Sequence, residues 1–518
     1  MSHTTDHRDV VIVGGGHNAL VAATLLARAG LAVTVLERLE HVGGAAVSAR
    51  TFPDHDARLS RYSYLVSLFP DRLVAELGLR LELRSRDTAS FTPYVHPDGT
   101  PDGLLVSADP AATAESFRRL TGGSTEISQW RDFYGDVEEL AAVVAPTLLR
   151  PLPRASDLRD RTDPTTWSEV VERPLGEAIE ARFANDLVRG VVATDALIGT
   201  FASLHEPSLV QNRCFLYHLV GNGTGEWRVP VGGMGAVTGE LERVAREAGA
   251  EIVTATTVDT VRPDHDGVTV TAGRRTWRAG HVLSGVAPAA LAELRGTPSA
   301  PPPEGSQLKV NLLLSRLPRL RSGIDPAIAF AGTLHLGESL TELEAAYAEA
   351  ASGHLPTRAS GEVYCHTLTD RSILGPELAA TEAQTLTYFG LHTPPSTLPD
   401  AAAAQEAYAR VVAAIDEHLA EPLTPLVLGV EVKTPSDVEA ALAMPGGHIF
   451  HGDLAWPWLD DDETADTPAE RWGVATEHPR VLECGSGARR GGAVSGLGGH
   501  AAAAAIVEHL GIGDLDLS

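Results

Sequence analysis

Hydrophobic and polar positions at the start of the chain predict a β-α-β unit. Residues 9–13 form a mostly apolar run rich in β-branched side chains, which is typical of a buried parallel strand. Residues 20–29 are apolar and rich in helix-forming residues, and Gly30 follows where a helix commonly ends. Residues 32–36 then form a second strand-like run.

Similar patterns recur in two later parts of the chain. Residues 237–248 have helical periodicity, residues 251–254 read as a strand, and residues 258–284 alternate like a small antiparallel meander. Near the C-terminus, residues 480–484 predict a strand, and a helix is expected from about residue 498 to residue 510.

A glycine-rich turn with the pattern G-x-G-x-x-A joins the first strand to the first helix. Its residues are Gly14, Gly15, Gly16, His17, Asn18 and Ala19. The first glycine allows a tight turn, the third lets the backbone approach a pyrophosphate, and the alanine lets the helix pack near the strand. Glu37 ends the second strand, where a carboxylate accepts hydrogen bonds from an adenosine ribose and disfavours a 2′-phosphate. The unit therefore predicts a site for FAD or NAD, with an unoccupied structural unit as the alternative.

A glycine pair soon after Glu37 favours FAD over NAD. Gly43-Gly44 resembles the extended fingerprint of two-dinucleotide-binding flavoproteins, although a simple loop would also contain such a pair. The C-terminal strand is followed by a glycine-rich turn and a helix N-terminus, which form a second site for electronegative atoms. The residues expected to contact FAD are Gly14, Gly16, His17, Asn18, Ala19, Glu37, Arg38, Gly43, Gly44, Ala45, Val258, Gly485, Gly487, Gly492, Ala493 and Val494.

Composition narrows the class of partner. The 518 residues carry a net charge of −27, which disfavours nucleic acid and anionic membranes as partners. Three widely separated cysteines form no Cys-x-x-Cys and so exclude a disulfide scaffold and a dithiol reductase. The N-terminal residues lack the apolar segment of a signal peptide, and no uncharged apolar stretch has the length of a membrane span. We expect a cytoplasmic protein of two or three domains, either a monomer or a homodimer.

Several longer segments resemble the phytoene desaturase-like FAD-dependent oxidoreductases. They are most similar to the branch that contains the pyridine nucleotide-disulphide oxidoreductase domain-containing protein 2. The segments are residues 43–48 (GGAAVS), 59–68 (LSRYSYLVSL), 230–235 (PVGGMG), 444–452 (MPGGHIFHG) and 484–492 (CGSGARRGG). The sequence departs from this pattern at His448, where Asn is expected, and at Arg489-Arg490, which replaces a His-Pro-like pair.

The resemblance implies an α/β fold, with a Rossmann-like FAD-binding domain of the two-dinucleotide-binding flavoprotein type and an inserted substrate domain. It also implies that the C-terminal helix points at the flavin ring, where its dipole would stabilise the reduced flavin. Two glycine-rich segments, residues 233–235 and 496–501, imitate nucleotide motifs but follow no clean strand, so no separate NAD(P)H domain is expected. The expected boundaries are residues 8–85, 228–300 and 470–518 for the FAD domain, and residues 86–227 and 301–469 for the substrate domain.

No side chain stands out in the sequence as the catalytic group. The candidates are His451, Tyr64 and Arg490. For the wall of the substrate pocket, the candidates are Tyr62, Trp227, His448 and His451. Each has a structural alternative: a core histidine, a core aromatic ring, or a surface salt bridge for the arginine pair. No metal site is expected, because the glycine-rich context of the two histidines does not present them together on a helix.

These observations predict an FAD-dependent oxidoreductase with non-covalent FAD. The leading hypothesis is a desaturase or dehydrogenase that removes a hydride from a mostly apolar small molecule and leaves a double bond. The electrons would pass to oxygen or a quinone, since no second nucleotide domain is evident. An amine or amino-acid oxidase is an alternative, and it would need a cavity with aromatic walls or a carboxylate beside the substrate nitrogen. A redox-neutral isomerase or a non-catalytic flavoprotein is the third possibility.

Overall fold

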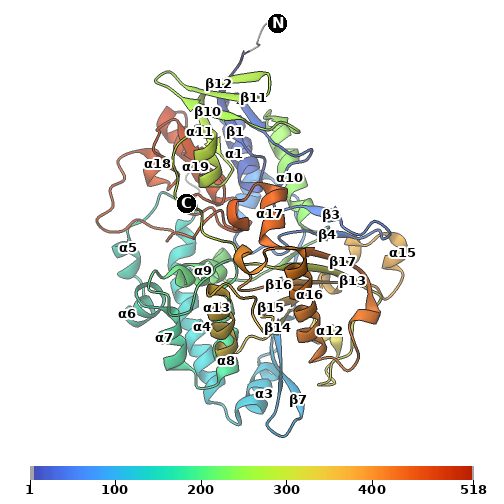
Figure 1. Ribbon diagram of the computed structural model, residues 1–518. Helices are drawn as coiled ribbons and strands as arrows, with labels where there is room; N and C mark the ends of the chain where they lie inside the picture. Colours follow the sequence, from blue (N-terminus) through green and yellow to red (C-terminus); the bar gives the residue numbers. More distant parts are fainter. Residues whose placement is uncertain (1–4, 516–518) are drawn as a thin grey trace.

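Two seven-stranded mixed β-sheets and a helical region make up most of the described part of the chain (Figure 1). The computed structural model describes residues 5–515. In the view of Figure 1, the first sheet and its helices lie at the top, the second sheet lies at the lower right, and the helical region lies at the lower left. Among the described residues, no helix combines the length and the hydropathy that a membrane span requires.

The first sheet contains the predicted β-α-β unit at its centre. Strand β1 (Thr5–Val13) pairs in parallel with β2 (Val33–Leu36) and with β12 (Arg275–Ser284). Next to β2 lies β9 (Glu251–Val253), and next to β12 lies β18 (Val481–Glu483), both parallel to their neighbours. The antiparallel strands β10 (Thr260–Pro263) and β11 (Val268–Ala272) extend the sheet beyond β12. The predicted meander is thus present, but its last strand also pairs in parallel with β1.

Both faces of β1 are buried over residues 10–13, as the apolar run predicts. Val10 and Ile12 pack in the core that includes helices α1 (His17–Arg28), α10 (Met234–Glu247) and α19 (Leu497–Leu510). Val11 and Val13 pack in a second core with α11 (Pro288–Arg295). Helices α1 and α19 approach so closely that a Cβ at Gly499 would lie 1.9 Å from the carbonyl oxygen of Asn18. The Rossmann-type fold expected from the sequence is therefore confirmed.

The second sheet takes most of its strands from the segment between β12 and β18. Its order is β17-β13-β16-β15-β14-β6-β7, and all neighbours are antiparallel except β14 and β6. The bounds are β6 (Thr88–Val95), β7 (Pro101–Ser107), β13 (Lys309–Leu314), β14 (Thr333–Leu336), β15 (Gly361–Tyr364), β16 (Gln384–Gly390) and β17 (Val427–Lys433). This separation of strands supports the domain boundaries expected from the sequence, which stay a prediction.

The two faces of the second sheet differ in chemistry. Alternate positions such as Val310, Val363 and Tyr388 pack in an apolar core that includes helix α16 (Ala401–Asp416). The intervening positions, which must point to the opposite face because side chains alternate along a strand, are largely polar. Those that are buried include Lys309, Asn311, His335, Glu362 and Thr387. Polar side chains therefore cover a face of this sheet that solvent does not reach.

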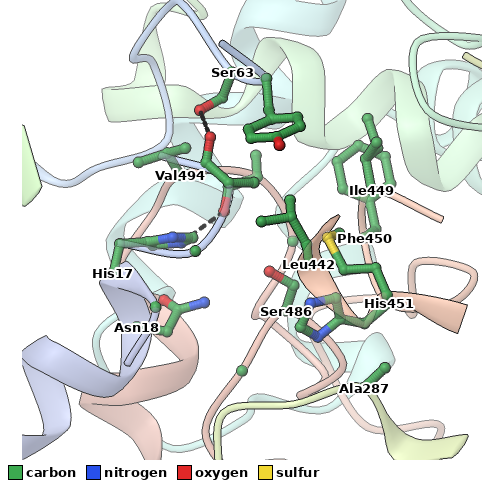
Figure 2. A pocket seen from close by; sticks show the side chains of 18 of the residues that line it. His17, Asn18, Ser63, Ala287, Leu442, Ile449, Phe450, His451, Ser486 and Val494 are labelled. Atoms are coloured by element: carbon green, nitrogen blue, oxygen red, sulfur yellow. Dashed lines mark hydrogen bonds between the residues drawn. The ribbon is translucent and has the colours of Figure 1, made fainter. Parts of the chain in front are cut away.

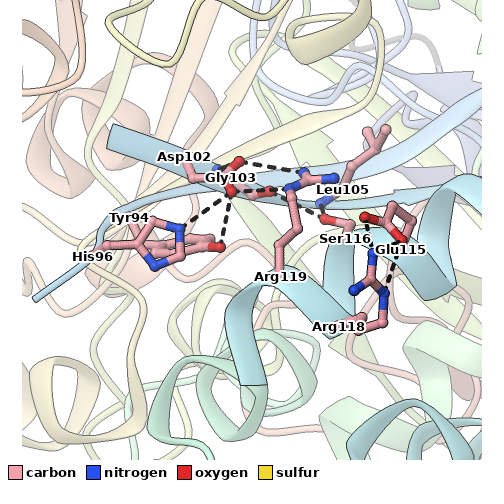
Figure 3. Close-up of polar contacts among 9 residues, drawn as sticks. All are labelled: Tyr94, His96, Asp102, Gly103, Leu105, Glu115, Ser116, Arg118 and Arg119. Carbon is pink, nitrogen blue, oxygen red and sulfur yellow. Dashed lines mark hydrogen bonds and ion pairs between the residues drawn. The ribbon is translucent and has the colours of Figure 1, made fainter. Parts of the chain in front are cut away.

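The helical region stands on that polar side of the second sheet. Its longer helices are α3 (Pro110–Thr121), α4 (Thr125–Val144), α7 (Leu175–Arg182), α8 (Asp186–Thr194), α9 (Val210–Leu219) and α13 (Leu340–Ala351). Asp102 on β7 links α3 to the β6–β7 hairpin (Figure 3). Its carboxylate accepts a hydrogen bond from Arg119 of α3 at 2.9 Å and one from the Tyr94 hydroxyl of β6 at 3.2 Å. The Nε2 atom of His96 lies 3.4 Å from the same carboxylate.

Shorter elements complete the path of the chain. The remaining strands are β3 (Ser48–Arg50), β4 (Arg58–Ser60), β5 (Leu83–Arg84) and β8 (Val229–Pro230). The remaining α-helices are α2 (Asp71–Leu77), α5 (Ala155–Arg159), α6 (Pro164–Trp167), α12 (Pro326–Ala329), α14 (His366–Thr369), α15 (Pro376–Ala379), α17 (Pro435–Leu442) and α18 (Pro468–Arg471).

Candidate functional site

A cavity of about 660 Å³ connects the first sheet to the polar face of the second. It extends from the β1–α1 turn, past the C-terminal glycine-rich loop, to side chains of β13, β15 and β16. We call its two parts the nucleotide end, around residues 14–19 and Glu37, and the sheet end, around Tyr64, Lys309 and Tyr364. Figure 2 shows the middle of this cavity, where His17 and Asn18 of α1 face His451.

The nucleotide end has room for a ligand beside the N-terminus of α1. Gly16 is the residue before the helix and offers no capping side chain, so the first N–H groups of α1 are available to a ligand. A Cβ added at Gly16 would meet no atom within 4 Å. At Gly15, in contrast, a Cβ would lie 3.0 Å from Val42 and 3.2 Å from the Glu37 carboxylate. Only the third glycine of the motif therefore opens onto free space.

Glu37 is held in place at this end by the backbone. Its two carboxylate oxygens accept hydrogen bonds from Gly15 N–H and from Leu39 N–H, both at 2.7 Å. The side chain is buried and lines the cavity, and each oxygen keeps a lone pair for another donor. This geometry suits the ribose hydroxyl groups of an adenosine.

Backbone strain marks the opposite wall of the cavity. His451 and Ala493 have φ angles of 65° and 57°, which non-glycine residues rarely adopt, and both line the cavity. His17 Nε2 lies 3.0 Å from the carbonyl oxygen of Ala493, and Asn18 Nδ2 donates to the carbonyl of Gly491 at 3.1 Å (Figure 2). Contacts from α1 therefore hold the C-terminal loop against the cavity.

Two buried polar atoms of the cavity wall have no partner within the described residues. They are Asn18 Oδ1 and His451 Nδ1. Burial lowers the pKa of both His451 and His17 to about 4, so both rings are neutral near pH 7. Because buried polar atoms are nearly always hydrogen-bonded, these two fit a ligand with its own donors and acceptors. Together with the open turn and Glu37, they fit FAD.

Most residues predicted to bind FAD do line the cavity. Gly14, Gly16, His17, Asn18, Ala19, Glu37, Arg38, Gly44, Ala45, Val258, Gly485, Gly492, Ala493 and Val494 are among its lining residues. Gly43 and Gly487 are not. Gly43 instead donates its N–H to the carbonyl of Gly15 at 2.8 Å, and a Cβ at Gly487 would lie 2.6 Å from Pro288. These two glycines shape the turns behind the cavity wall.

Three aromatic rings wall the sheet end. Tyr64 lies 4.5 Å from Tyr364 and 6.1 Å from Phe389, measured between ring centroids. Tyr62 and Trp227, the sequence candidates for the wall of a substrate pocket, also line the cavity, and Trp227 donates its indole N–H to the carbonyl of His218 at 3.1 Å. The predicted candidate Tyr64 therefore lies in the cavity, although its role stays a prediction.

Ionisable groups of the second sheet face the same space. Lys309 Nζ donates to the carbonyl of Tyr62 at 2.6 Å and lies 4.6 Å from the centre of the Tyr64 ring. The Tyr364 hydroxyl donates a short hydrogen bond to Glu362. Burial raises the pKa of Glu362 and lowers that of Lys309, so burial favours the neutral form of each.

Behind Glu362 lies a buried acid–imidazole cluster. His335 Nε2 is 3.8 Å from Glu362, and its Nδ1 is 3.7 Å from Glu338 and 2.9 Å from the Thr92 hydroxyl. Glu338 accepts a hydrogen bond from the Thr194 hydroxyl at 2.6 Å. Burial raises the pKa of Glu338 well above its ordinary value and lowers that of His335 to about 3. The cluster is therefore a network of largely neutral groups.

Asp195 and Arg86 also line the sheet end. Asp195 follows α8 directly, and its carboxyl has no hydrogen-bond or ion-pair partner within residues 5–515. Burial raises its pKa to about 7. Arg86 lies between β5 and β6, with its guanidinium carbon 5.9 Å from the centre of the Tyr364 ring.

Two predicted site residues lie outside this cavity. The Arg490 guanidinium is buried and donates to the carbonyls of Pro457, Leu148 and Arg150, so it stabilises loops instead of facing a substrate. His448 is also buried, and its Nδ1 accepts the Phe450 N–H at 3.3 Å. Of the other candidates, His451 does line the cavity.

Arg489 and Cys484, which flank the C-terminal glycine-rich turn, contact other parts of the protein. Arg489 forms the salt bridge that was the alternative to ligand binding, with Glu463 at 2.9 Å. Cys484 is a buried free thiol at the end of β18 and does not belong to the cavity lining.

Sequence reasoning missed the ionisable residues of the sheet end. Asp195, Lys309, Glu362, Tyr364 and Arg86 come from four distant segments. A signal was present in β13 and β15, where polar residues (Lys309 and Asn311, and Glu362) stand next to apolar ones. In isolation, that alternation indicates a strand with one solvent-facing side.

Comparison with known proteins identifies the family. Residues 20–314, more than half of the chain, match the family described as flavin containing amine oxidoreductase. The chain belongs to this family. It is an FAD-dependent oxidoreductase, and FAD is its cofactor.

Relatives of this flavin amine oxidoreductase align along almost the whole chain. An uncharacterized protein of Mycobacterium tuberculosis is 48% identical over 521 residues, which cover 96% of this chain and 97% of that protein. The mouse pyridine nucleotide-disulfide oxidoreductase domain-containing protein 2 is 30% identical, covering 97% of this chain and 94% of its own length. This confirms the branch expected from the sequence.

Among solved structures, cyclohexylamine oxidase from Brevibacterium oxydans shares the fold. Its TM-score is 0.59 at 16% identity, and the match covers 97% of this chain and 99% of that chain.

Proposed function

We propose that this flavin amine oxidoreductase oxidises a small amine. The observation that carries the proposal is the Asp195 carboxyl, which lines the cavity with no partner among the described residues. It shares the cavity with the rings of Tyr64, Tyr364 and Phe389. A carboxylate and aromatic faces are the groups that attract an ammonium ion, by charge and by cation–π interaction.

The chemistry assigned to this chain's residues is binding and orientation. In amine oxidation, the substrate loses a proton from nitrogen and a hydride from the adjoining carbon, and the resulting imine is hydrolysed by water. FAD, when bound, supplies the hydride acceptor. Asp195 would hold the nitrogen, and the three rings would exclude water around the reacting carbon.

The polar sheet end favours an amine over the mostly apolar substrate of the leading sequence hypothesis. An apolar chain in this cavity would leave Asp195, Arg86 and the neighbouring polar groups without partners, at a cost of roughly 1–3 kcal/mol for each neutral group and more for a charge. The amine-oxidase hypothesis requires a cavity with aromatic walls and a carboxylate, and the sheet end contains both. The fold shared with cyclohexylamine oxidase is compatible with this choice. Oxygen or a quinone is proposed as the final electron acceptor.

The experiment measures binding of benzyltrimethylammonium to the holoenzyme, followed through the visible absorbance of the flavin. This cation keeps its charge at every pH, so the pH dependence of its binding reports on the protein. Because the pKa of Asp195 is about 7, binding should tighten as the pH rises through 7.

Asp195→Asn should weaken binding at pH 8 by about 10-fold or more and remove this pH dependence. The matched control is Asp453→Asn, because Asp453 is exposed and lies outside the cavity lining. Equal binding to the wild type and to Asp195→Asn would contradict the proposal.

A further inference from the structure

Arg86 has an unusual environment for a charged side chain. It is half-buried and lines the sheet end of the cavity, yet its guanidinium has no hydrogen bond or ion pair with any residue from 5 to 515. The guanidinium carbon lies over the Tyr364 ring, 5.9 Å from its centre, in a cation–π contact. Five N–H donors are therefore available to a ligand.

The acidic groups near Arg86 do not neutralise it. Glu362, Tyr64, Tyr364 and Glu226 are the groups whose charges act on it. Glu362 is bound to Tyr364 and is driven toward its neutral form by burial, as are the two tyrosines. Glu226 is exposed to solvent and forms no ion pair with Arg86.

An arginine does not lose its proton in a protein, so this charge persists. A half-buried cation without a partner carries a desolvation cost, and the cavity is the space from which a partner can come.

We propose that Arg86 binds a carboxylate of the substrate, so that the amine oxidised here is an amino acid or another amine that carries an acid group. This inference rests on the proposed function and narrows it to a substrate class. A guanidinium presents parallel N–H groups that match the two oxygens of a carboxylate.

The positions of the charged groups agree with a substrate of two opposite charges. Arg86 and Asp195 both line the cavity, and the charges of both act on the pKa of Glu362, which lines it too. Arg86 and Asp195 form no ion pair with each other, so the cavity offers one group for an anion and another for a cation. An amine without an acid group would occupy only the second.

The test uses phenylacetate, a carboxylate without an amine, as a probe of the holoenzyme. Its aromatic ring suits the walls formed by Tyr64, Tyr364 and Phe389. Binding is followed through the shift of the flavin absorbance, so the measurement does not depend on turnover. Far-UV circular dichroism and the flavin content of each variant establish that it is folded and loaded.

Arg86→Met should weaken phenylacetate binding by about 10- to 100-fold, because a charge-assisted hydrogen-bond pair is lost. Arg86→Lys keeps the charge without the planar fork and should be intermediate. The control is Arg84→Met, since Arg84 is exposed, pairs with Glu82 and lies outside the cavity lining. Unchanged affinity in Arg86→Met, or no binding of phenylacetate to the wild type, would overturn the inference.

Substrate pairs separate this inference from the proposed function. L-Phenylalanine and 2-phenylethylamine differ only in the carboxylate, and Arg86→Met should lower kcat/KM at least 10-fold for the first compound and little for the second. If phenylacetate binding depends on Arg86 but neither amine reduces the flavin anaerobically, the carboxylate site stands and amine oxidation fails. If 2-phenylethylamine reduces the flavin and phenylacetate does not bind, amine oxidation stands and the carboxylate site fails.

Discussion

Gly16→Ala provides the sharpest test of how this fold holds FAD. Gly16 has φ −69° and ψ 171°, a conformation that alanine adopts freely, and the new Cβ would meet no protein atom within 4 Å. The stability of the protein without FAD should therefore change by no more than about 0.5 kcal/mol. The methyl group would, however, occupy the space beside the N-terminus of α1, where a pyrophosphate must approach the backbone.

The expected magnitude follows from binding linkage. If the methyl group weakens FAD binding 100-fold, a concentration of FAD that stabilised the wild type by about 2.7 kcal/mol would contribute only about 0.4 kcal/mol to the variant. The assay is thermal unfolding of each protein with and without added FAD, together with the FAD content after purification. Gly16→Val should show a larger effect in the same direction.

Gly15→Ala is the matched comparison. Its Cβ would lie 3.0 Å from Val42 and 3.1 Å from the Glu37 side chain, so this variant should destabilise the protein even without FAD. A Gly16→Ala protein that retains stoichiometric FAD and shows the wild-type shift in melting temperature would refute the placement of the pyrophosphate.

Three further outcomes are expected from variants outside the cavity. Gly239 lies exposed inside α10 with free space around its Cβ position, so Gly239→Ala should stabilise the protein by about 0.5–1 kcal/mol in urea unfolding. Burial raises the pKa of Glu483 to about 8 in the folded state. The stability that the protonated side chain contributes is therefore complete below its ordinary pKa near 4.5 and is lost as the pH rises through 8. The stability of Glu483→Gln relative to the wild type should be about 2.5 kcal/mol higher at pH 8.5 than at pH 6. Arg490→Met would remove the hydrogen bonds that the buried guanidinium donates to the carbonyls of Leu148, Arg150 and Pro457, and thermal unfolding should show a loss of about 3 kcal/mol or more.

The nucleotide end of the cavity could be predicted from the sequence because its signals are local. The strand, turn and helix around residues 9–29 and the acid at residue 37 lie within one continuous segment, and each residue type has its own geometric reason. The errors there were small. Helix α1 begins at His17, three residues before the predicted start, and Gly30 follows the end of the helix with φ 90°.

The sheet end could not be predicted because its burial is a property of the assembled fold. Lys309 and Phe389 are 80 positions apart and become neighbours only when β13 pairs with β16. The alternation in β13 and β15 correctly indicates strands, but it does not reveal that a helical region covers the polar side.

Arg490 shows that a residue predicted to lie in the site can instead have a structural role that only the fold reveals. Next to a glycine-rich loop, an arginine suggests a ligand site, but here three backbone carbonyls from other segments satisfy it.

Amine oxidation is tested most directly by anaerobic titration of the purified holoenzyme. A panel of small amines, including 2-phenylethylamine and L-phenylalanine, is added in turn, and a matched panel of hydrocarbons and alkenes without nitrogen serves as the comparison. The visible flavin absorbance is recorded, and the product is assayed for ammonia after hydrolysis. The proposed function predicts that at least one amine bleaches the flavin and releases ammonia, while the compounds without nitrogen leave the absorbance unchanged. Bleaching by a compound without nitrogen, with none by any amine, would contradict it.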